Sequence, residues 1–267
     1  STISASNQQS VQNEYRGTYS KSVNLGLTRG SVEDDYITAY TFDNQLTYNL
    51  EKGKSKLNVT GLQSAFKTTT EMNVGSVTNL PFNSYWYNMQ SAGSFSIGSS
   101  FSQRSLSSYM GRINYTFNDK YLFTFTGRSD GASQLAEGKK WAFFPSGAFA
   151  WRLGDENFVK NLNVFSDLKL RVSFGQVGNS VVSPYQTSAT LAGTNYNFGQ
   201  NAGIGLAPGN LPNQELGWER SEELNLGLNV GFFNNRVTAA IEVYNRTTKD
   251  LIMRQALPTT AGFGNIK

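Results

Sequence analysis

The sequence predicts an all-β chain of about nine antiparallel strands, with the strand length and loop pattern of a transmembrane β-barrel. Apolar and polar residues alternate with a period of two in one segment after another. These segments are roughly 10–14 residues long, whereas soluble strands average about 5–6 residues and a tilted membrane strand needs about 9–11. Short connections also alternate with long ones, which is typical of outer-membrane barrels.

Composition excludes the common catalytic routes. The chain has 267 residues, with 13% aromatic and 16% charged residues and neither Cys nor His. Without these two residue types there is no thiol nucleophile, Cys-based zinc site, His-ligated metal or imidazole base. The net charge of +4 comes without a run of Lys or Arg, so nucleic-acid binding is not predicted. We therefore expect no enzyme activity, no catalytic residue, no metal and no cofactor.

The clearest predicted hairpin lies in the middle of the chain. Residues 109–117 place Tyr, Gly and Ile on one face and Met, Arg and Asn on the other. The polar turn 118–120 follows, and the alternation resumes over 121–128. The pattern predicts one apolar, aromatic face and one polar, cationic face.

The same alternation predicts the remaining strands. Two strands near the C-terminal end flank the Asn234-Asn235 turn signal, and a segment near the N-terminus is the weakest of the set. These further strands are expected at 19–28, 40–50, 57–66, 143–153, 168–175, 224–232 and 237–244.

The predicted connections differ in length. We expect short turns at 51–54, 118–120 and 233–236, with a moderate connection at 154–166. Longer connections are expected at 29–37, 67–106, 129–140 and 177–217. In a barrel the short turns are periplasmic and the long loops extracellular.

Two other classes share the alternation. A soluble, secreted β-sandwich with lectin-like carbohydrate binding also has half-buried antiparallel strands. A β-propeller glycosidase would need two converging carboxylates, but neighbours such as Glu222 and Glu223 point to opposite faces of a strand. The acidic run 33–35 is interpreted as a solvated turn.

Three long blocks carry a family resemblance. They are SYMGRINYTFNDKYLFTFTGRSDGAS from Ser108, FFPSGAFAWRLGDENFVKNLNVFSDLKLRVSFGQVGN from Phe143 and LGWERSEELNLGLNVGFFNNRVTAAIEVYNRTTKDLI from Leu216. The closing LPTTAGFGN from Leu257 is also similar. In this order the blocks resemble the SusC/RagA family of TonB-linked outer-membrane transporters.

The resemblance implies a plugged barrel of about 22 strands in the bacterial outer membrane. Residues 1–267 would then be a single partial barrel domain, an internal fragment without the plug domain and the remaining strands. It implies active uptake of oligosaccharides or peptides with a SusD-like surface lipoprotein, driven by the TonB complex through the plug.

Under this interpretation the apolar faces meet lipid, and the opposite faces line the lumen. The residues expected to face the lumen are Arg112, Arg128, Lys169, Arg171, Glu223 and Glu242. Alternatively, these side chains only solvate a polar interior or pair with one another.

Aromatic residues on the long loops are the candidates for substrate contact, because rings stack on sugars. They are Tyr85, Trp86 and Tyr87 on the 67–106 loop, and Tyr196 and Phe198 on the 177–217 loop. Alternatively, these rings pack the loops onto themselves or onto a partner.

Overall fold

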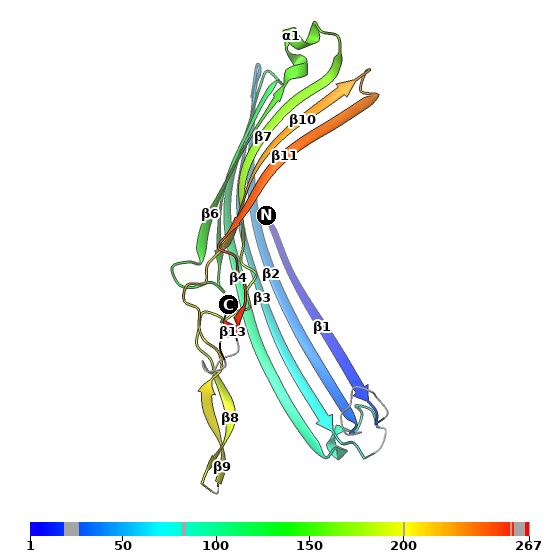
Figure 1. Cartoon of the computed structure of the whole chain (residues 1–267), viewed down its shortest axis with the longest axis vertical. Coiled ribbons are helices and arrows are strands. Elements are labelled where there is room, and N and C mark those ends of the chain that lie inside the picture. Colours follow the sequence, from blue (N-terminus) through cyan, green and yellow to red (C-terminus); the bar gives the residue numbers. More distant parts are fainter. Residues whose placement is uncertain (19–26, 82–83, 200, 257, 259–264, 267) are drawn as a thin grey trace. The chain divides into compact units, whose positions relative to one another are not determined.

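The computed structural model describes residues 1–18, 27–81, 84–199, 201–256, 258 and 265–266 (Figure 1). Within them, nine strands form one sheet in the order β1-β2-β3-β4-β5-β6-β7-β10-β11. The bounds are β1 Thr2–Arg16, β2 Arg29–Lys52, β3 Ser55–Thr78, β4 Ser94–Phe117, β5 Tyr121–Ala132, β6 Trp141–Arg152, β7 Phe165–Asn179, β10 Glu219–Phe232 and β11 Val237–Lys249.

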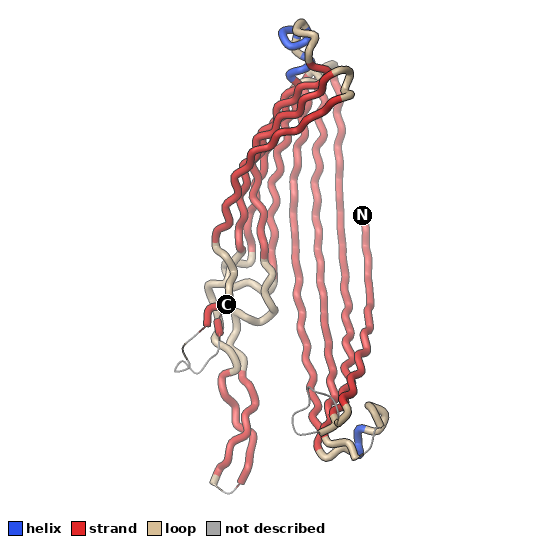
Figure 2. The backbone as a smooth tube through the Cα atoms, turned by 45° about the vertical axis from the view of Figure 1, so that its right-hand side comes forward, coloured by secondary structure: helices blue, strands red, loops and turns tan. Residues whose placement is uncertain are grey.

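Small elements complete the described chain. Strands β8 (Leu191–Phe198) and β9 (Asn201–Pro208) form a separate hairpin, and β12 (Gln255–Ala256) pairs with β13 (Asn265–Ile266). Strands dominate the backbone trace (Figure 2), and the helical turns are η2 (Met89–Ser91), η3 (Leu153–Asp155) and α1 (Asn157–Lys160). Among the described residues, no helix has the length and apolar character needed to span a membrane.

The predicted number of strands is confirmed, but the first part of the chain differs from the prediction. The weak strand at 19–28 lies largely outside the described residues, and the first strand of the sheet is β1. Two predictions are wrong: the loop at 29–37 and the solvated turn at 33–35. Both segments belong to β2. The predicted loop 67–106 shortens to 79–93, since β3 and β4 extend into it.

Most of these errors share a physical cause. Strands β2, β3 and β4 each have 24 residues, about 80 Å at the usual rise per residue. A strand that crosses a bilayer needs only about 9–11 residues. In β2 and β3 this surplus has polar residues on both faces and gives no clear period-two apolar signal. In β4, Phe95, Ile97 and Phe101 alternate with Ser and Gly, a signal that the sequence analysis missed.

After the first connection, which lies at 17–28 and not at 29–37, the connections follow the predicted order. Tight turns occupy 53–54, 118–120 and 233–236, and η3 with α1 lies in the connection 153–164. The connections at the other strand ends are 17–28, 79–93, 133–140 and 180–218. Asn118 and Asp119 both have φ of 53°, the left-handed conformation that Asn and Asp tolerate in tight hairpin turns.

The chain divides into two compact units. The first comprises Ser1, Asp43–Ala65 and Leu106–Lys267, and the second comprises Thr2–Phe42 and Phe66–Ser105. The expected single partial domain over 1–267 stays a prediction.

In the first unit, the strand register separates two faces of the sheet. One row runs Tyr115, Phe123, Phe149, Val172, Leu226 and Val243 across β4, β5, β6, β7, β10 and β11. We call this side of the sheet the apolar face. The neighbouring row runs Asn114, Thr124, Ala148, Ser173, Asn225 and Tyr244, and it defines the polar face.

The apolar face is uncovered in this unit. Phe125 and Phe143 are each 58% exposed, and Leu226 is 49% exposed. The buried side chains of the strands in this unit, including Phe144 and Ala142, instead lie on the polar face, where these two are opposite Arg128 and Asp130 in the register. A soluble sandwich would bury its apolar face against a second sheet, whereas a membrane barrel exposes that face to lipid.

Aromatic rings mark both ends of the apolar face. Near the tight turns, the ring of Tyr121 stacks between those of Phe117 and Trp151, with centroid separations of 6.4 and 5.9 Å. Toward the longer connections, Tyr109 stacks on Trp141 at 6.0 Å. Such paired aromatic belts flank the apolar band of membrane barrels.

Glu156 ties the belt near the tight turns to the connection between β6 and β7. Its carboxylate accepts hydrogen bonds from Tyr121 Oη at 2.7 Å, Lys120 Nζ at 2.9 Å and Trp151 Nε1 at 3.2 Å. These three bonds, led by that from Lys120, lower the pKa of Glu156 from 4.5 to about 2. One carboxylate therefore holds the polar edges of two belt rings.

A charge on the apolar face should destabilise the barrel. Phe174 and Ser173 are neighbours on β7 at the same depth, on the apolar and the polar face respectively. We expect Phe174→Lys to lower the unfolding free energy in lipid by about 2–4 kcal/mol, the cost of a cation near the midplane. Ser173→Lys serves as the control and should cost much less. Equal costs in denaturant titrations would contradict the assignment of the faces.

Glu156→Gln should destabilise the protein at pH 7, because the amide loses the charge-assisted bonds. The depressed pKa of Glu156 means that its stabilisation is present above about pH 4.5 and disappears as the pH falls toward 2. The difference in unfolding free energy between wild type and variant should shrink over the same interval. Asp155→Asn, next to it in a looser 3.5 Å pair with Lys160, is the matched control. A pH-independent difference would rule out this carboxylate as the source.

Candidate functional site

The six charged residues expected to face the lumen lie on one face of the sheet. Arg112 and Arg128 lie on β4 and β5, Lys169 and Arg171 on β7, and Glu223 and Glu242 on β10 and β11. Their register positions all fall on the polar face. That this face lines the lumen stays a prediction.

Two of these residues form an ion pair. Arg171 Nη2 donates to Glu242 Oε1 at 2.5 Å and to Asn229 Oδ1 at 3.0 Å. Gly227 lies beneath the guanidinium, and a Cβ there would lie 3.0 Å from Arg171 Nη2. The pair joins β7 to β11 across β10, and both side chains are partly exposed, so it contributes little to stability.

Arg128 forms an ion pair with a buried carboxylate. Its Nε lies 2.8 Å from both carboxylate oxygens of Asp130, and its Nη2 donates to Ser108 Oγ at 3.1 Å. Asp130 and Ser108 are both buried. Arg112 Nε donates to Thr126 Oγ1 at 3.2 Å. Arg128 therefore holds the sheet together where β5 ends.

An amide ladder crosses the polar face nearer the tight turns. Asn58 Nδ2 donates to Asn49 Oδ1 at 2.6 Å, and Asn114 Nδ2 donates to Asn58 Oδ1 at 3.0 Å. Thr124 Oγ1 extends the ladder by donating to Asn114 Oδ1 at 2.9 Å. These polar side chains thus hydrogen-bond to one another, and the face is hydrophilic.

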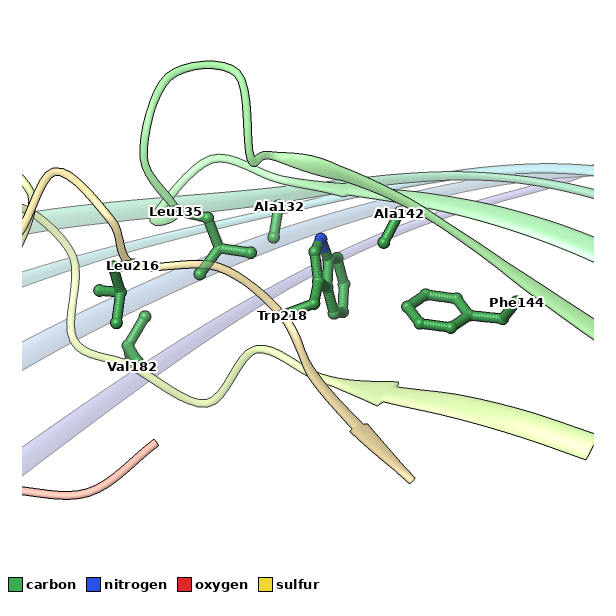
Figure 3. Close-up of a cluster of buried hydrophobic side chains, with 7 residues drawn as sticks. All are labelled: Ala132, Leu135, Ala142, Phe144, Val182, Leu216 and Trp218. Carbon is green, nitrogen blue, oxygen red and sulfur yellow. The ribbon is translucent and has the colours of Figure 1, made fainter. Parts of the chain in front are cut away.

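A hydrophobic cluster lies on the polar side, where β5 and β6 approach the longer connections (Figure 3). Phe144 and Trp218 meet edge to face with ring centroids 5.4 Å apart. We call the whole set the loop anchor: Ala132, Leu135, Ala142, Phe144, Val182, Leu216 and Trp218.

Hydrogen bonds complete the loop anchor. Trp218 Nε1 donates to the carbonyl of Lys140 at 2.8 Å, and the amide of Ala136 donates to the carbonyl of Leu216 at 2.9 Å. Gln134 Nε2 reaches the carbonyl of Ser180 at 3.0 Å. The 133–140 loop and both ends of the 180–218 connection are therefore held against the sheet.

The sequence analysis missed this anchor. It treated 129–140 and 177–217 as long loops, but β5 extends to Ala132 and β7 to Asn179. The available signal was the apolar character of Ala142 and Phe144 at positions whose neighbours along β6, toward the tight turns, are polar or small.

The aromatic residues of the 79–93 connection gather in the second unit. Tyr85 packs against Tyr15 of β1 with centroids 4.8 Å apart and against Trp86 at 5.9 Å, and Trp86 meets Tyr87 at 5.3 Å. Tyr87 is 81% exposed. Tyr85 has φ of 54°, a conformation that an aromatic residue adopts only under constraint. The structure therefore brings three predicted residues together with Tyr15, which was not predicted.

The other predicted pair lies on the β8–β9 hairpin of the first unit. Tyr196 pairs with Gly203 and is exposed. Phe198 pairs through its backbone with Asn201, and its side chain lies outside the described part of the structure. The two aromatic groups belong to separate units and are described individually.

Comparison with known proteins identifies the family. The sequence model for the family described as "TonB dependent receptor-like, beta-barrel" matches residues 2–266. The chain belongs to this family, whose members are transporters of the bacterial outer membrane, and its sheet is part of a large transmembrane β-barrel.

Individual relatives agree with the family assignment. TonB-dependent receptor P3 of Formosa agariphila is 36% identical over 82% of this chain and 22% of its own length. TonB-dependent receptor P26 of the same organism is 31% identical over 99% of this chain and 27% of its own length. TonB-dependent receptor SusC of Bacteroides thetaiotaomicron is 38% identical over 60% of this chain and 16% of its own length. The chain thus spans about a quarter or less of these relatives.

Solved structures show the same fold. The RagAB peptide transporter superposes with a TM-score of 0.83 at 22% identity, over 99% of this chain and 29% of that one. The same importer in its open-open state gives a TM-score of 0.72 at 23% identity, over the same shares of both chains. At this level of identity the likeness concerns the fold.

Removing the centre of the loop anchor should release the loops. Trp218→Ala should cost about 3–5 kcal/mol of local stability, as for other buried aromatic truncations. We expect much faster proteolytic cleavage within 180–218 in lipid-embedded protein, located by mass spectrometry. Trp141→Ala is the matched control, because this Trp is 53% exposed and lies on the apolar face. Unchanged cleavage in Trp218→Ala would show that the anchor does not hold the loops.

Proposed function

We propose that this chain forms part of the wall and surface loops of an active nutrient importer in the outer membrane. The observation that carries the proposal is the family match over residues 2–266, combined with a sheet whose apolar face is exposed and whose opposite face is charged. The cargo would be oligosaccharides or peptides, since SusC and the RagAB peptide transporter are both similar to this chain.

In this proposal the chain supplies the static part of the importer. A SusD-like surface lipoprotein would close over the loops, and the TonB complex would act through a plug domain outside residues 1–267. The amide ladder and the Arg171–Glu242 pair would give the lumen a hydrophilic wall. No catalytic step is assigned to these residues.

The aromatic group of the 79–93 connection is proposed to contact cargo. Its backbone is braced, because Gly30 lies under the carbonyl of Tyr85, where a Cβ would come within 3.3 Å. Thr28 Oγ1 also accepts a bond from the amide of Leu80 at 2.6 Å. A braced loop that presents exposed rings such as Tyr87 suits stacking on a sugar or a peptide side chain. Tyr196 and Phe198 are proposed to act similarly on the β8–β9 hairpin.

Uptake by cells tests the proposal. The complete gene product would be expressed in a deletion strain, and growth measured on neutral hexasaccharides and on casein peptides as sole carbon sources. We expect growth on one of these sources only when the gene and a functional TonB complex are present. The triple variant Tyr85→Ala/Trp86→Ala/Tyr87→Ala should slow uptake about tenfold or more at limiting cargo, whereas Phe158→Ala, on α1, should not. Growth that does not depend on the gene would refute the importer assignment.

A further inference from the structure

A polar pocket of about 500 Å³ lies in the first unit between the 133–140 loop and two stretches of the 180–218 connection. It is distinct from both predicted aromatic groups. Its lining includes Ser133, Glu137, Lys140, Tyr185, Thr187 and Gln214.

The walls of the pocket are fixed in place. On one side, Leu135 and Ala136 line it from below and are almost completely buried, Leu135 as part of the loop anchor. On the other side, Asn210 fastens the connection to itself: its Oδ1 accepts from the amide of Thr190 at 2.6 Å, and its Nδ2 donates to the carbonyl of Ser188 at 3.0 Å. The pocket is therefore preformed, which lowers the entropic cost of binding.

Tyr185 is the aromatic residue among the described residues that line the pocket. Its φ of 67° is in the left-handed region, and the amide of Ser188 closes a turn on its carbonyl at 3.2 Å. The amide of Asn213 also bonds the carbonyl of Gln186 at 3.1 Å. The surrounding bonds thus hold an unfavourable backbone conformation that leaves the Tyr185 side chain 46% exposed. Strain of this kind concentrates at binding sites.

The chemistry of the lining favours a sugar ring. Carboxylate, hydroxyl, amide and ammonium groups supply both acceptors and donors for the hydroxyls of a pyranose, and Tyr185 offers a face for its C–H side. The apolar contributors Leu135 and Ala136 are almost completely buried, so they offer little apolar surface to a peptide side chain.

The charges around the pocket give acidic sugars no advantage over neutral ones. Glu137 and Glu215 both line it, with Lys140 as the facing cation. Glu215 forms an ion pair with Lys139, whereas Glu137 forms no ion pair within the described residues. The two carboxylates and the two lysine ammonium groups therefore balance, so no net positive charge attracts uronate or sulfate groups. Glu137 can accept hydrogen bonds from the hydroxyls of a neutral sugar.

We propose that this pocket is a binding subsite for one residue of a neutral oligosaccharide, with Tyr185 as the stacking ring and Glu137 as the hydroxyl acceptor. The inference rests on the proposed importer function and names the cargo class for this site.

Calorimetry on the complete transporter in detergent tests the inference with defined probes: maltohexaose, xylohexaose and mannohexaose, with hexagalacturonate and pentaalanine as competitors. We expect binding of at least one neutral hexasaccharide, and weaker binding of the uronate and the peptide. Tyr185→Ala and Glu137→Gln should each weaken binding about tenfold, the loss expected for one charge-assisted bond or stacking contact. Tyr185→Phe keeps the ring and should stay within about threefold.

Matched controls and outcomes keep the two proposals separate. Glu51→Gln, beside a tight turn, and Phe158→Ala should leave affinity unchanged, and resistance of the barrel to unfolding in detergent gels verifies folding of every variant. The subsite is refuted if the uronate or the peptide binds more tightly than every neutral probe. It is also refuted if affinity for the sugar survives both Tyr185→Ala and Glu137→Gln. If either result is found while growth still depends on the gene and on TonB, only the subsite is refuted and the importer function stands. If growth does not depend on them, both proposals are refuted.

Discussion

The hydrogen-bonded register of the antiparallel ladder is the constraint on which the rest of the structure depends. Side chains alternate between the two faces of a strand, so a slip of one residue would move a complete set of apolar side chains to the opposite side. From β4 to β11 the register keeps Tyr115, Phe123 and Phe149 in one row and Asn114, Thr124 and Ala148 in the next. The aromatic belts, the amide ladder and the Arg171–Glu242 pair all require that alignment.

The same constraint explains which features could be predicted. Where strands cross lipid, one face must be apolar, so the residues of β5, β7 and β10 alternate visibly between apolar and polar. The placement of Arg112 and Glu223 on one face followed from parity alone. Outside the bilayer only the backbone ladder is required, so β1 and the outer parts of β2 and β3 have polar residues on both faces and could not be recognised as strands. The outer part of β4 does alternate, through Phe95, Ile97 and Phe101, and was missed.

The loop anchor could not be predicted from the sequence pattern, for a different reason. Phe144 and Trp218 lie far apart in the chain, and their contact depends on how the 180–218 connection returns to the sheet. Gly178 on β7 makes room for this contact, because a Cβ there would clash with the Phe144 ring and lie 2.8 Å from Trp218. No local periodicity records such a contact. The polar pocket beside Tyr185 is equally non-local, since its walls come from two connections.

Glu156 gives the belt near the tight turns an unusual independence from its surroundings. Belt tyrosines and tryptophans ordinarily seek hydrogen-bond partners among lipid head groups and interfacial water. Here the hydroxyl of Tyr121 and the indole nitrogen of Trp151 both donate to the protein's own carboxylate. The depth at which this edge of the wall sits is then set by its apolar height alone. It should stay the same in membranes whose head groups differ in charge or hydrogen-bonding capacity.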